Sequence, residues 1–263
     1  MSTPESSVQL YSVREALEAD LDGTLARLAG LGLRNVEAFD FVRRAPQIAA
    51  ALKSAGLSAP TGHAPFLSDE LGFGDQVVPV PPQAQTFAAA AEVGLRIVID
   101  PFVAPAHWAD RDEVSRTAER LNAAAAEAAE HGLRVGYHNH AHEFAHSFDG
   151  TSAYEVFVAQ LDPAVVLELD AYWAAIGGQD VTALVERLGA RLVALHVKDG
   201  ATADPSVAPQ GQVPAGEGDV PLAAALDAAS GLEYAVLEFD VYDGDVFEAL
   251  GEGVRYLDAR GIR

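Results

Sequence analysis

Apolar and polar positions along the chain follow one recurring pattern. A stretch rich in alanine, leucine and glutamate, spaced as in an amphipathic helix, ends at a glycine and runs into a short segment rich in β-branched residues. A helix that stops at glycine before such a segment predicts a helix followed by a strand. Six such units follow one another, and they end at Phe39, Phe66, Phe102, His140, Asp199 and Asp240.

Two further segments complete the set of predicted strands. Val8 to Val13 precedes the first helix, and Ala164 to Asp170 follows a turn at Asp162 and Pro163. Eight strands alternating with helices predict a parallel sheet with right-handed crossovers. In about 250 residues the economical α/β architecture is a single (β/α)8 TIM barrel, and we expect one domain over residues 1–263. An open doubly wound sheet is the rival, but the glycine-rich phosphate loop that normally follows its first strand is missing between Gln9 and Asp20.

Composition and charge exclude several classes of protein. With 49% hydrophobic residues the chain can bury a sizeable core, so it is not mainly disordered. The net charge of -22 is spread along the chain without a basic patch, which argues against nucleic acid and anionic membranes as partners. The absence of cysteine excludes disulfides, thiolate nucleophiles and cysteine-ligated zinc. Neither a signal peptide nor a long apolar run is recognisable, so a cytoplasmic protein is the default expectation.

Two segments are long enough to be functional loops. Phe66 to Pro82 and Asp199 to Pro221 both follow predicted strands, so both are expected on the face of the barrel where enzymes of this architecture place their chemistry. We expect them to be candidate lids. Barrels of this type often form dimers or tetramers, so a homo-oligomer stays open, and the first of these loops is one place for its interface.

Ionisable residues gather where the predicted strands end. Because parallel strands of a barrel end at one mouth, these side chains are expected to face a common space. Buried carboxylates, imidazoles and an amine need a compensating partner, and a divalent metal ion is the most economical one. Carboxylate and imidazole donors suit Mn2+, Mg2+ or Co2+, with Zn2+ as a further alternative. The residues are Glu37, His63, Asp100, His138, His140, Glu143, Asp170, His196, Lys198 and Glu238.

The densest group lies at Tyr137 to Phe144, which reads YHNHAHEF. Strand alternation sends His138 and His140 to the same side, and Glu143 lies just beyond, where it can fold back over the mouth. Three histidines and a glutamate at one strand end predict a metal ligand or a catalytic base.

Several short motifs, taken together, resemble a known family. QLYSVR near the start, YHNHAHEF, ELDAYW, HVKD, GEGDV at Gly216 to Val220 and the late LEFD are similar to the xylose isomerase-like TIM-barrel superfamily, in its sugar phosphate isomerase/epimerase group. The resemblance covers essentially the whole chain. It implies one divalent metal ion bound by a glutamate, an aspartate, a histidine and a second glutamate.

Carried over residue by residue, the resemblance assigns most of these ligands. Asp170, His196 and Glu238 match the last three positions. Many relatives have a glutamate inside the strand where this chain has His138, so Glu143 is our choice for the first ligand and His138 is the reserve.

The resemblance also implies a reaction in which a base removes a proton from the carbon beside a carbonyl, while a divalent metal ion stabilises the resulting enediolate. Mn2+ is the first choice for this ion. His140 is the best candidate for this base, with His138 and Lys198 as further catalytic residues. We expect His63 and Lys198 to orient or polarise a carbohydrate substrate, with Glu37 as a further substrate-binding residue. Tyr172 and Trp173 would form a wall against the sugar face.

The candidate residues bear on four possible functions. A metal-dependent isomerase or epimerase of a sugar or keto-sugar comes first, and a metal-dependent lyase or dehydratase acting on a 3-keto-sugar, an inosose or a 3-oxo-glycoside is the alternative. A phosphorylated substrate is disfavoured because no arginine cluster is available to bind a phosphate. An apurinic-endonuclease-like DNA-binding protein is opposed by the net charge of -22. A non-catalytic sugar-binding barrel is expected to lack ligands that this chain has.

Overall fold

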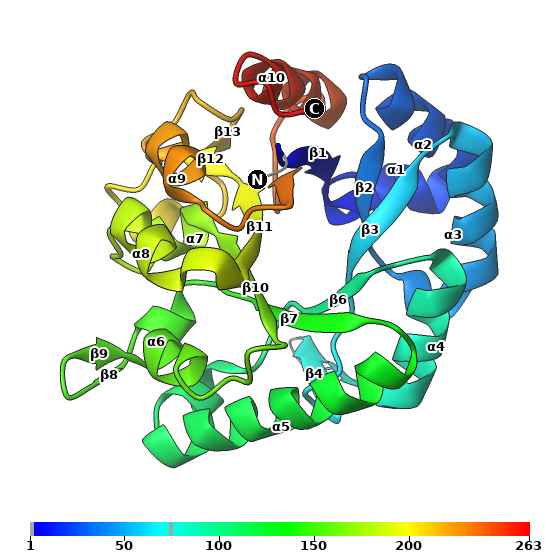
Figure 1. Cartoon of the computed structure of the whole chain (residues 1–263). Helices are drawn as coiled ribbons and strands as arrows, with labels where there is room; N and C mark the ends of the chain where they lie inside the picture. The colour runs from blue at the N-terminus through cyan, green and yellow to red at the C-terminus, as the bar shows by residue number, and fades with distance from the viewer. Residues whose placement is uncertain (1–2, 74–75) are drawn as a thin grey trace.

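A closed ring of eight parallel strands forms the centre of the molecule (Figure 1). The computed structural model describes residues 3–73 and 76–263. The strands of the ring pair in the order β1-β14-β11-β10-β7-β6-β3-β2, and a parallel bridge between Gln9 and Glu37 joins its two ends. The prediction of a single TIM barrel is therefore confirmed. The ring strands are β1 (Glu5–Val8), β2 (Asn35–Ala38), β3 (Ser58–His63), β6 (Ile97–Asp100), β7 (Arg134–His138), β10 (Val166–Asp170), β11 (Leu192–Val197) and β14 (Tyr234–Leu237).

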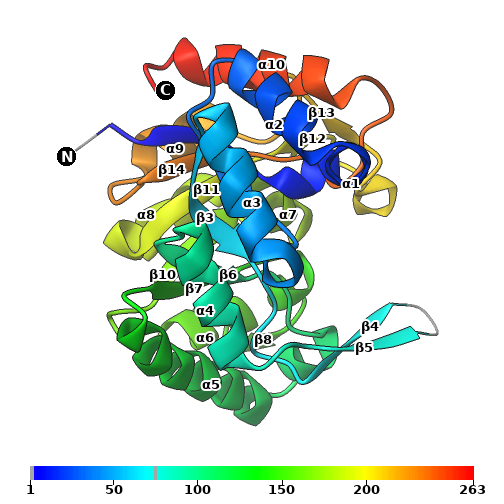
Figure 2. The same cartoon turned by 90° about the vertical axis from the view of Figure 1, so that its right-hand side faces the viewer.

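Helices surround the ring and connect its strands (Figures 1 and 2). The α-helices are α1 (Arg14–Ala19), α2 (Leu21–Gly30), α3 (Phe41–Ala55), α4 (Gln83–Val93), α5 (Arg111–Glu130), α6 (Ala153–Val158), α7 (Ala171–Ile176), α8 (Val181–Leu188), α9 (Leu222–Ala228) and α10 (Val246–Asp258). Short 3-10 turns are η1 (Leu10–Val13), η2 (Pro105–Trp108), η3 (His142–Phe144), η4 (Gly189–Arg191) and η5 (Pro205–Val207). In the described part of the chain, no helix combines the length and the apolar character that crossing a membrane requires.

The apolar core has two layers because successive strand residues point to opposite faces. On β6, Ile97 and Ile99 belong to a small cluster inside the barrel, whereas Val98 belongs to the large cluster between the strands and the helices. Both clusters are shielded from water, so the lower part of the barrel is a packed core and only the end that carries the polar residues is left for chemistry.

The predicted position of the first strand is wrong. We expected a strand over Val8 to Val13, but β1 ends at Val8 and Leu10–Val13 forms η1. The reason lies in Gln9, whose side-chain oxygen accepts the backbone N–H of Tyr11 at 3.0 Å and so turns the chain out of the extended form. Its amide nitrogen simultaneously donates to Glu37 at 2.7 Å inside the barrel.

Both long loops contain small antiparallel sheets. Phe66 to Pro82 contains β4 (Glu70–Phe73) and β5 (Gln76–Pro79), a hairpin that projects from the barrel in Figure 2, although Gly74 and Asp75 at its tip lie outside the described residues. Asp199 to Pro221 contains β12 (Asp199–Gly200) and β13 (Gln212–Val213). A third hairpin, β8 (Ser147–Phe148) and β9 (Thr151–Ser152), precedes α6. The first two begin just after β3 and β11, beside the polar end of the barrel.

A single carboxylate organises the second loop. Asp199 is buried and accepts four backbone N–H groups, those of Gly200, Gly216, Gly218 and Val220, at 2.9 to 3.1 Å. The carboxylate thus joins the HVKD and GEGDV motifs, which are 17 or more residues apart in sequence. The close fit also explains Gly218, where a Cβ atom would lie only 2.2 Å from Asp199 Oδ1.

We expect Asp199→Ala to destabilise the protein by about 2 to 4 kcal/mol, because it leaves several buried N–H groups without an acceptor. Urea unfolding followed by circular dichroism measures this loss. Asp227→Ala is the matched control, since Asp227 is exposed on α9 and its loss should change stability by no more than about 0.5 kcal/mol. Equal stability of the two variants would contradict the anchoring role of Asp199.

Candidate functional site

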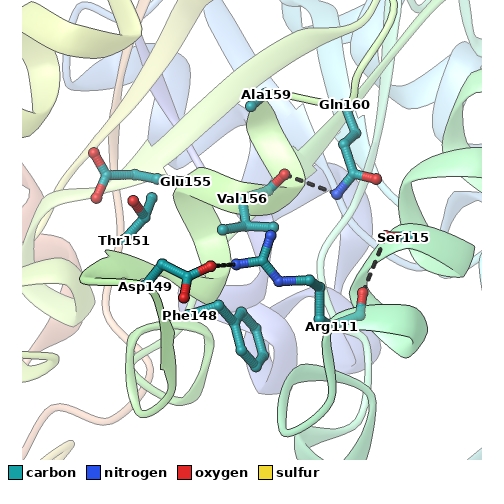
Figure 3. Close-up of a pocket in the computed structure, with 9 residues that line it drawn as sticks. All are labelled: Arg111, Ser115, Phe148, Asp149, Thr151, Glu155, Val156, Ala159 and Gln160. Atoms are coloured by element: carbon teal, nitrogen blue, oxygen red, sulfur yellow. Dashed lines mark hydrogen bonds and ion pairs between the residues drawn. The ribbon is translucent and has the colours of Figure 1, made fainter.

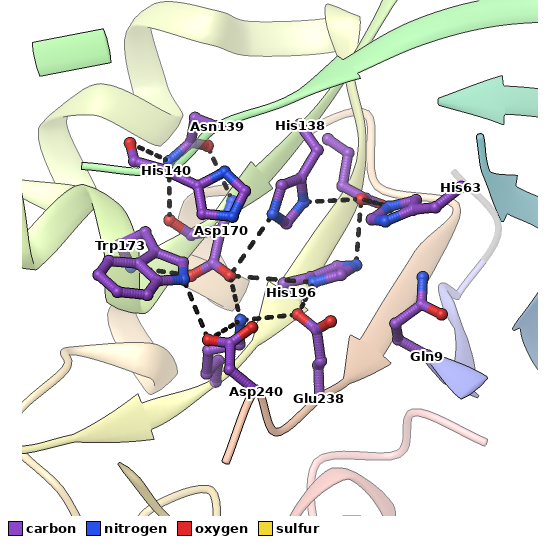
Figure 4. Close-up of polar contacts among 12 residues, drawn as sticks. Gln9, His63, His138, Asn139, His140, Asp170, Trp173, His196, Glu238 and Asp240 are labelled. Carbon is purple, nitrogen blue, oxygen red and sulfur yellow. Dashed lines mark hydrogen bonds and ion pairs between the residues drawn. The ribbon is translucent and has the colours of Figure 1, made fainter. Parts of the chain in front are cut away.

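Potential metal ligands converge at the polar end of the barrel (Figure 4). Two overlapping groups have donor atoms that all lie within 4.8 Å of one another. We call His138, Asp170, His196 and Glu238 the outer group, and His63, His138, Glu168 and His196 the inner group. Every member of the outer group is buried. Three of its members are the ligands that the sequence assigned, and the fourth is His138, the reserve for the first position.

The outer group is assembled from the ends of four strands. His138, Asp170 and His196 lie on β7, β10 and β11, and Glu238 directly follows β14. His196 Nδ1 is 2.7 Å from Glu238 Oε2, and His138 Nε2 is 3.8 Å from Asp170 Oδ2. Asn139 fixes the spacing of two strands, because its side-chain oxygen accepts the backbone N–H of Asp170 at 2.9 Å.

Two buried glutamates lie further into the barrel than the outer group. Glu168 precedes Asp170 by two residues on β10, so both side chains point to the same side of the strand. His63 Nε2 lies 2.6 Å from Glu168 Oε1 and 3.1 Å from Glu37 Oε1. Burial alone would lower the pKa of His63, but the charges of Glu37 and Glu168 outweigh it and raise this pKa to about 10.

Lys198 is enclosed by three carboxylates. Its ammonium group lies 2.8 Å from Asp170, 2.7 Å from Glu238 and 2.9 Å from Asp240. Burial would lower the pKa of Lys198, but these acids, Asp170 first, keep it well above its usual value. Lys198 therefore compensates the negative charge of the site, and it also donates a hydrogen bond to Asp240.

Asp240 connects the site to the second loop, and the sequence did not single it out. Its carboxylate accepts N–H groups from Trp173 at 3.1 Å, from Lys198 at 2.9 Å and from Gln212 at 2.7 Å. Gln212 also accepts the backbone N–H of Asp240 at 2.8 Å. Asp240 could have been found as a site residue from its position just after an apolar strand. Gln212 could not, because its hydrogen bonds with Asp240 depend on the conformation of the second loop.

His140 lies beside the outer group without belonging to it. Its ring is 5.2 Å from that of His138 and 5.7 Å from that of Trp173 (Figure 4). Burial, reinforced by the nearby charge of Lys198, lowers the pKa of His140 to about 3, so the ring is neutral at pH 7. Its Nδ1 atom is buried and has no hydrogen-bond partner among the described residues. An unprotonated nitrogen in this position can accept a proton from a bound molecule.

Glu143, the sequence's choice for the first ligand, belongs to neither group. One carboxylate oxygen accepts the hydroxyl of Tyr137 at 2.8 Å, and the other accepts the backbone N–H of His140 at 2.8 Å. Burial raises the pKa of Glu143 to about 8. In this arrangement Glu143 holds the backbone of the turn that carries His140.

Glu143→Gln tests this arrangement in two ways. The raised pKa makes the wild type lose stability, relative to the variant, as pH rises from about 4.5, the ordinary value, to about 8, because in that range the unfolded chain releases the proton that the buried Glu143 still holds. We expect the difference in unfolding free energy to change in this direction between pH 5 and 8, measured by urea titrations. We also expect the variant to retain its metal, whereas loss of the metal would support Glu143 as the first ligand.

The residues predicted to bind substrate lie in different surroundings. Glu37 is buried, and its carboxylate contacts the side chains of Gln9, His63 and His196. Tyr172 is fully buried in the outer core, so only Trp173 of this pair is near the mouth.

Asp100, also among the strand-end residues, serves a structural purpose. It accepts backbone N–H groups of Phe66 and Leu67, both at 2.7 Å, and thereby fixes the start of the first loop. Burial raises its pKa to about 6.

A cavity of about 500 Å3 opens beside the outer group. Its polar side includes His63, His138, His140, Glu238 and Asp240, and the rest of its lining includes aromatic and proline side chains. Leu71 of the β4–β5 hairpin also lines it, so the first loop does border the site. Among the described residues that line it there is no arginine or lysine.

A second hollow, of about 440 Å3, lies between α5, α6 and the β8–β9 hairpin (Figure 3). Its one basic side chain, Arg111, is paired with Asp149 at 2.6 Å and packs over the ring of Phe148. Neither group of potential metal ligands borders this hollow, so the cavity at the barrel mouth is the better candidate for chemistry.

Comparison with solved structures finds the same fold. A sugar phosphate isomerase/epimerase from Parabacteroides distasonis is similar with 23% identity and a TM-score of 0.76, over 98% of this chain and 95% of that one. A probable 3-DHS dehydratase, AsbF, from Bacillus anthracis is similar with 15% identity and a TM-score of 0.68, over 97% and 98%. An IOLI protein with a bound zinc atom is similar with 13% identity and a TM-score of 0.72, over 97% of each chain.

Comparison by sequence gives the family. No curated protein matches the chain significantly. The family model described as xylose isomerase-like TIM barrel matches residues 25–260, which include every strand of the ring except β1 and both groups of potential ligands. The chain therefore belongs to the xylose isomerase-like TIM-barrel family.

Proposed function

We propose that this protein is a divalent-metal-dependent isomerase or epimerase of a sugar or keto-sugar, which acts by removing a proton next to a carbonyl. The observation that carries the proposal is the convergence of His138, Asp170, His196 and Glu238 beside a cavity that also contains the neutral His140. The similar sugar phosphate isomerase/epimerase supports the reaction class.

The residues of the outer group fit a divalent ion. Two carboxylates and two imidazoles form a donor set for Mn2+, our first choice, and also for Co2+, Zn2+ or, less favourably, Mg2+. The site also has an excess of negative charge, because Glu37, Glu168, Asp170 and Glu238 are four buried carboxylates. Within the described chain, Lys198 is the one lysine or arginine in contact with them, and it reaches only Asp170 and Glu238. In the protein alone, His63 and His196, whose pKa values are raised, supply the remaining positive charge. A divalent cation is the natural replacement for such protons.

Each part of the mouth then has a task in the reaction. The bound ion supplies positive charge that stabilises the negative charge developing on the substrate oxygen. His140 accepts the proton from the carbon beside the carbonyl and returns it to another position. Trp173 is held by Asp240 near the ring of His140, so its indole can limit where that ring moves.

The chemistry of the cavity also narrows the substrate class. A phosphate group is normally held by arginine or lysine, and the described lining contains neither. We therefore favour an unphosphorylated sugar or keto-sugar.

A lyase or dehydratase acting on a keto-sugar is the second candidate. The specific observation is the histidine at the mouth, since a neutral imidazole that takes a proton can give it to a leaving hydroxyl or alkoxide. A similar fold occurs in the probable dehydratase AsbF. The two reactions share proton removal and differ only in whether a leaving group departs.

Elemental analysis followed by solvent isotope exchange tests the proposal. The protein is purified, stripped, reloaded with Mn2+, and incubated in D2O with ketoses, inososes and 3-keto-glycosides. We expect about one ion per chain and deuterium at the carbon beside the carbonyl, detected by NMR and mass spectrometry. A retained carbon skeleton with new stereochemistry supports the isomerase or epimerase, and an unsaturated product supports the lyase. Absence of any bound ion under every loading condition would overturn both.

A further inference from the structure

Three imidazole nitrogens converge on one oxygen atom of Glu168. His63 Nε2 lies 2.6 Å from Glu168 Oε1, His138 Nδ1 lies 2.9 Å from it, and His196 Nε2 lies 3.0 Å from it. Glu168 is fully buried, and its other oxygen has no hydrogen-bond partner among the described residues. A buried carboxylate that receives three histidines from three strands is unusual packing for a purely structural acid.

The two nitrogens of His138 and of His196 face in opposite directions. His138 turns Nδ1 toward Glu168 and Nε2 toward Asp170. His196 turns Nε2 toward Glu37, at 2.8 Å, and Nδ1 toward Glu238, at 2.7 Å. In each ring one nitrogen therefore faces an outer carboxylate and the other faces Glu168, and the second nitrogen of His196 also faces Glu37. We call Glu37 and Glu168 the inner carboxylates.

The opposite directions of the two ring nitrogens decide whether the inner group binds a second ion or supports the histidines of the outer group. Its donor atoms are close enough to hold a second ion. However, a neutral imidazole has one N–H group and one free nitrogen. If the outer nitrogens of His138 and His196 bind an ion, their inner nitrogens carry the protons and donate them to the inner carboxylates. A second ion in the inner group would require both rings to lose both protons.

We propose that Glu168, supported by Glu37, is a positioning residue that fixes the tautomer and the orientation of His138 and His196, so that their outer nitrogens are presented to a divalent ion. The inference rests on the proposed function, because it concerns the residues that would hold its metal. Carboxylates that accept the second N–H of a ligating histidine typically contribute 10- to 100-fold to metal affinity.

Neighbouring contacts hold the inner carboxylates in place. Gln9 donates to Glu37 at 2.7 Å from the turn after β1, and His63 Nε2 lies 2.6 Å from Glu168 Oε1 and 3.1 Å from Glu37 Oε1. Gln9 and His63 come from opposite sides of β2 in the ring. The inner carboxylates therefore cannot turn away from the histidines without breaking these contacts.

Glu168→Gln is the central test, because it keeps the shape of the side chain and removes its charge. We expect the dissociation constant for Mn2+, measured by titration calorimetry, to rise by about 10- to 100-fold. In Zn2+-loaded protein labelled with 15N-histidine, we expect wild-type spectra to show protonated Nδ1 for His138 and protonated Nε2 for His196, and the variant to lose this pattern. Glu233→Gln is the control, a glutamate that pairs with Arg134 and lies outside both groups, whose substitution should leave the affinity and the pattern unchanged.

Several outcomes would overturn the inference. Wild-type affinity and an unchanged histidine pattern in Glu168→Gln would show that the carboxylate positions nothing. Two Zn2+ ions per wild-type chain and one per variant chain would make Glu168 a ligand instead. A wild-type protein that binds no ion would overturn the proposed function itself, which is a different result.

Glu37→Gln keeps the inference testable if Glu168→Gln does not fold. This variant should weaken Mn2+ binding less and change the spectra of His196 and His63 but not that of His138, because Glu37 contacts the first two rings and not the third. An unchanged His196 spectrum in that variant would also overturn the inference.

Discussion

Glu238→Gln is expected to lose metal and activity together. Glu238 Oε2 lies 2.7 Å from both His196 Nδ1 and Lys198 Nζ. Burial would raise its pKa, but Lys198 and His196 outweigh burial and keep the carboxylate charged, which is the form that binds a cation. The amide of glutamine is neutral and binds a divalent ion far less well than a carboxylate does. The affinity for Mn2+ should fall by at least about 100-fold, more than the loss of a supporting carboxylate would cause.

Elemental analysis after dialysis, calorimetric titration with Mn2+ and the D2O exchange reaction measure the effect. Glu233→Gln is the matched control, because Glu233 pairs with Arg134 at 2.7 Å at the opposite end of the barrel strands. It should retain both ion and activity. If Glu238→Gln kept a full complement of tightly bound metal, the outer group would not be the metal site.

The barrel itself could be predicted because its determinants are local in sequence. In each unit, a glycine after a helix and a run such as Ile97 to Asp100 mark the helix end and the strand, whatever the rest of the chain does. The first strand was misplaced because Leu10 to Val13 has the composition of a strand. What turns it into η1 is the side chain of Gln9, whose cap on Tyr11 and bond to Glu37 exist only once the barrel has closed.

The candidate ligands could be predicted for a similar reason. Asp170, His196 and Glu238 each terminate an apolar strand, and parallel strands bring their ends to one mouth. The same logic would have found Glu168, since strand alternation puts it on the same side as Asp170, two residues earlier. A criterion based on strand ends misses Glu168, because this residue lies inside the strand rather than at its end.

Contacts between segments far apart in the chain could not be predicted from the sequence. Lys198 resembled a group free to bind substrate, yet three carboxylates from two other strand ends surround it. Gln212 reaches Asp240 only because Asp199 folds the intervening loop. The choice between Glu143 and His138 as first ligand depends on a side-chain contact closer in sequence, because one oxygen of Glu143 accepts the hydroxyl of Tyr137.

His140→Ala is expected to separate metal binding from catalysis. The His140 side chain belongs to neither group of potential ligands, so about one Mn2+ per chain should remain bound with unchanged affinity. Turnover should fall by about 10²- to 10⁴-fold, the range typical for loss of a general base. Deuterium exchange from D2O should fall by the same factor, because the base acts in the step that removes the proton.

His142→Ala is the control that makes the His140 result specific. The two rings stack 5.8 Å apart, but His142 Nε2 is occupied by the carbonyl oxygen of Val103 at 3.0 Å, whereas His140 Nδ1 has no partner among the described residues. Removing His142 should therefore change turnover by only a few-fold, although it loosens the packing around His140. If His140→Ala exchanged deuterium as fast as the wild type, the proton would have to leave through another group. The remaining ionisable side chains that line the cavity, His63, His138, Glu238 and Asp240, would then be the candidates for the base.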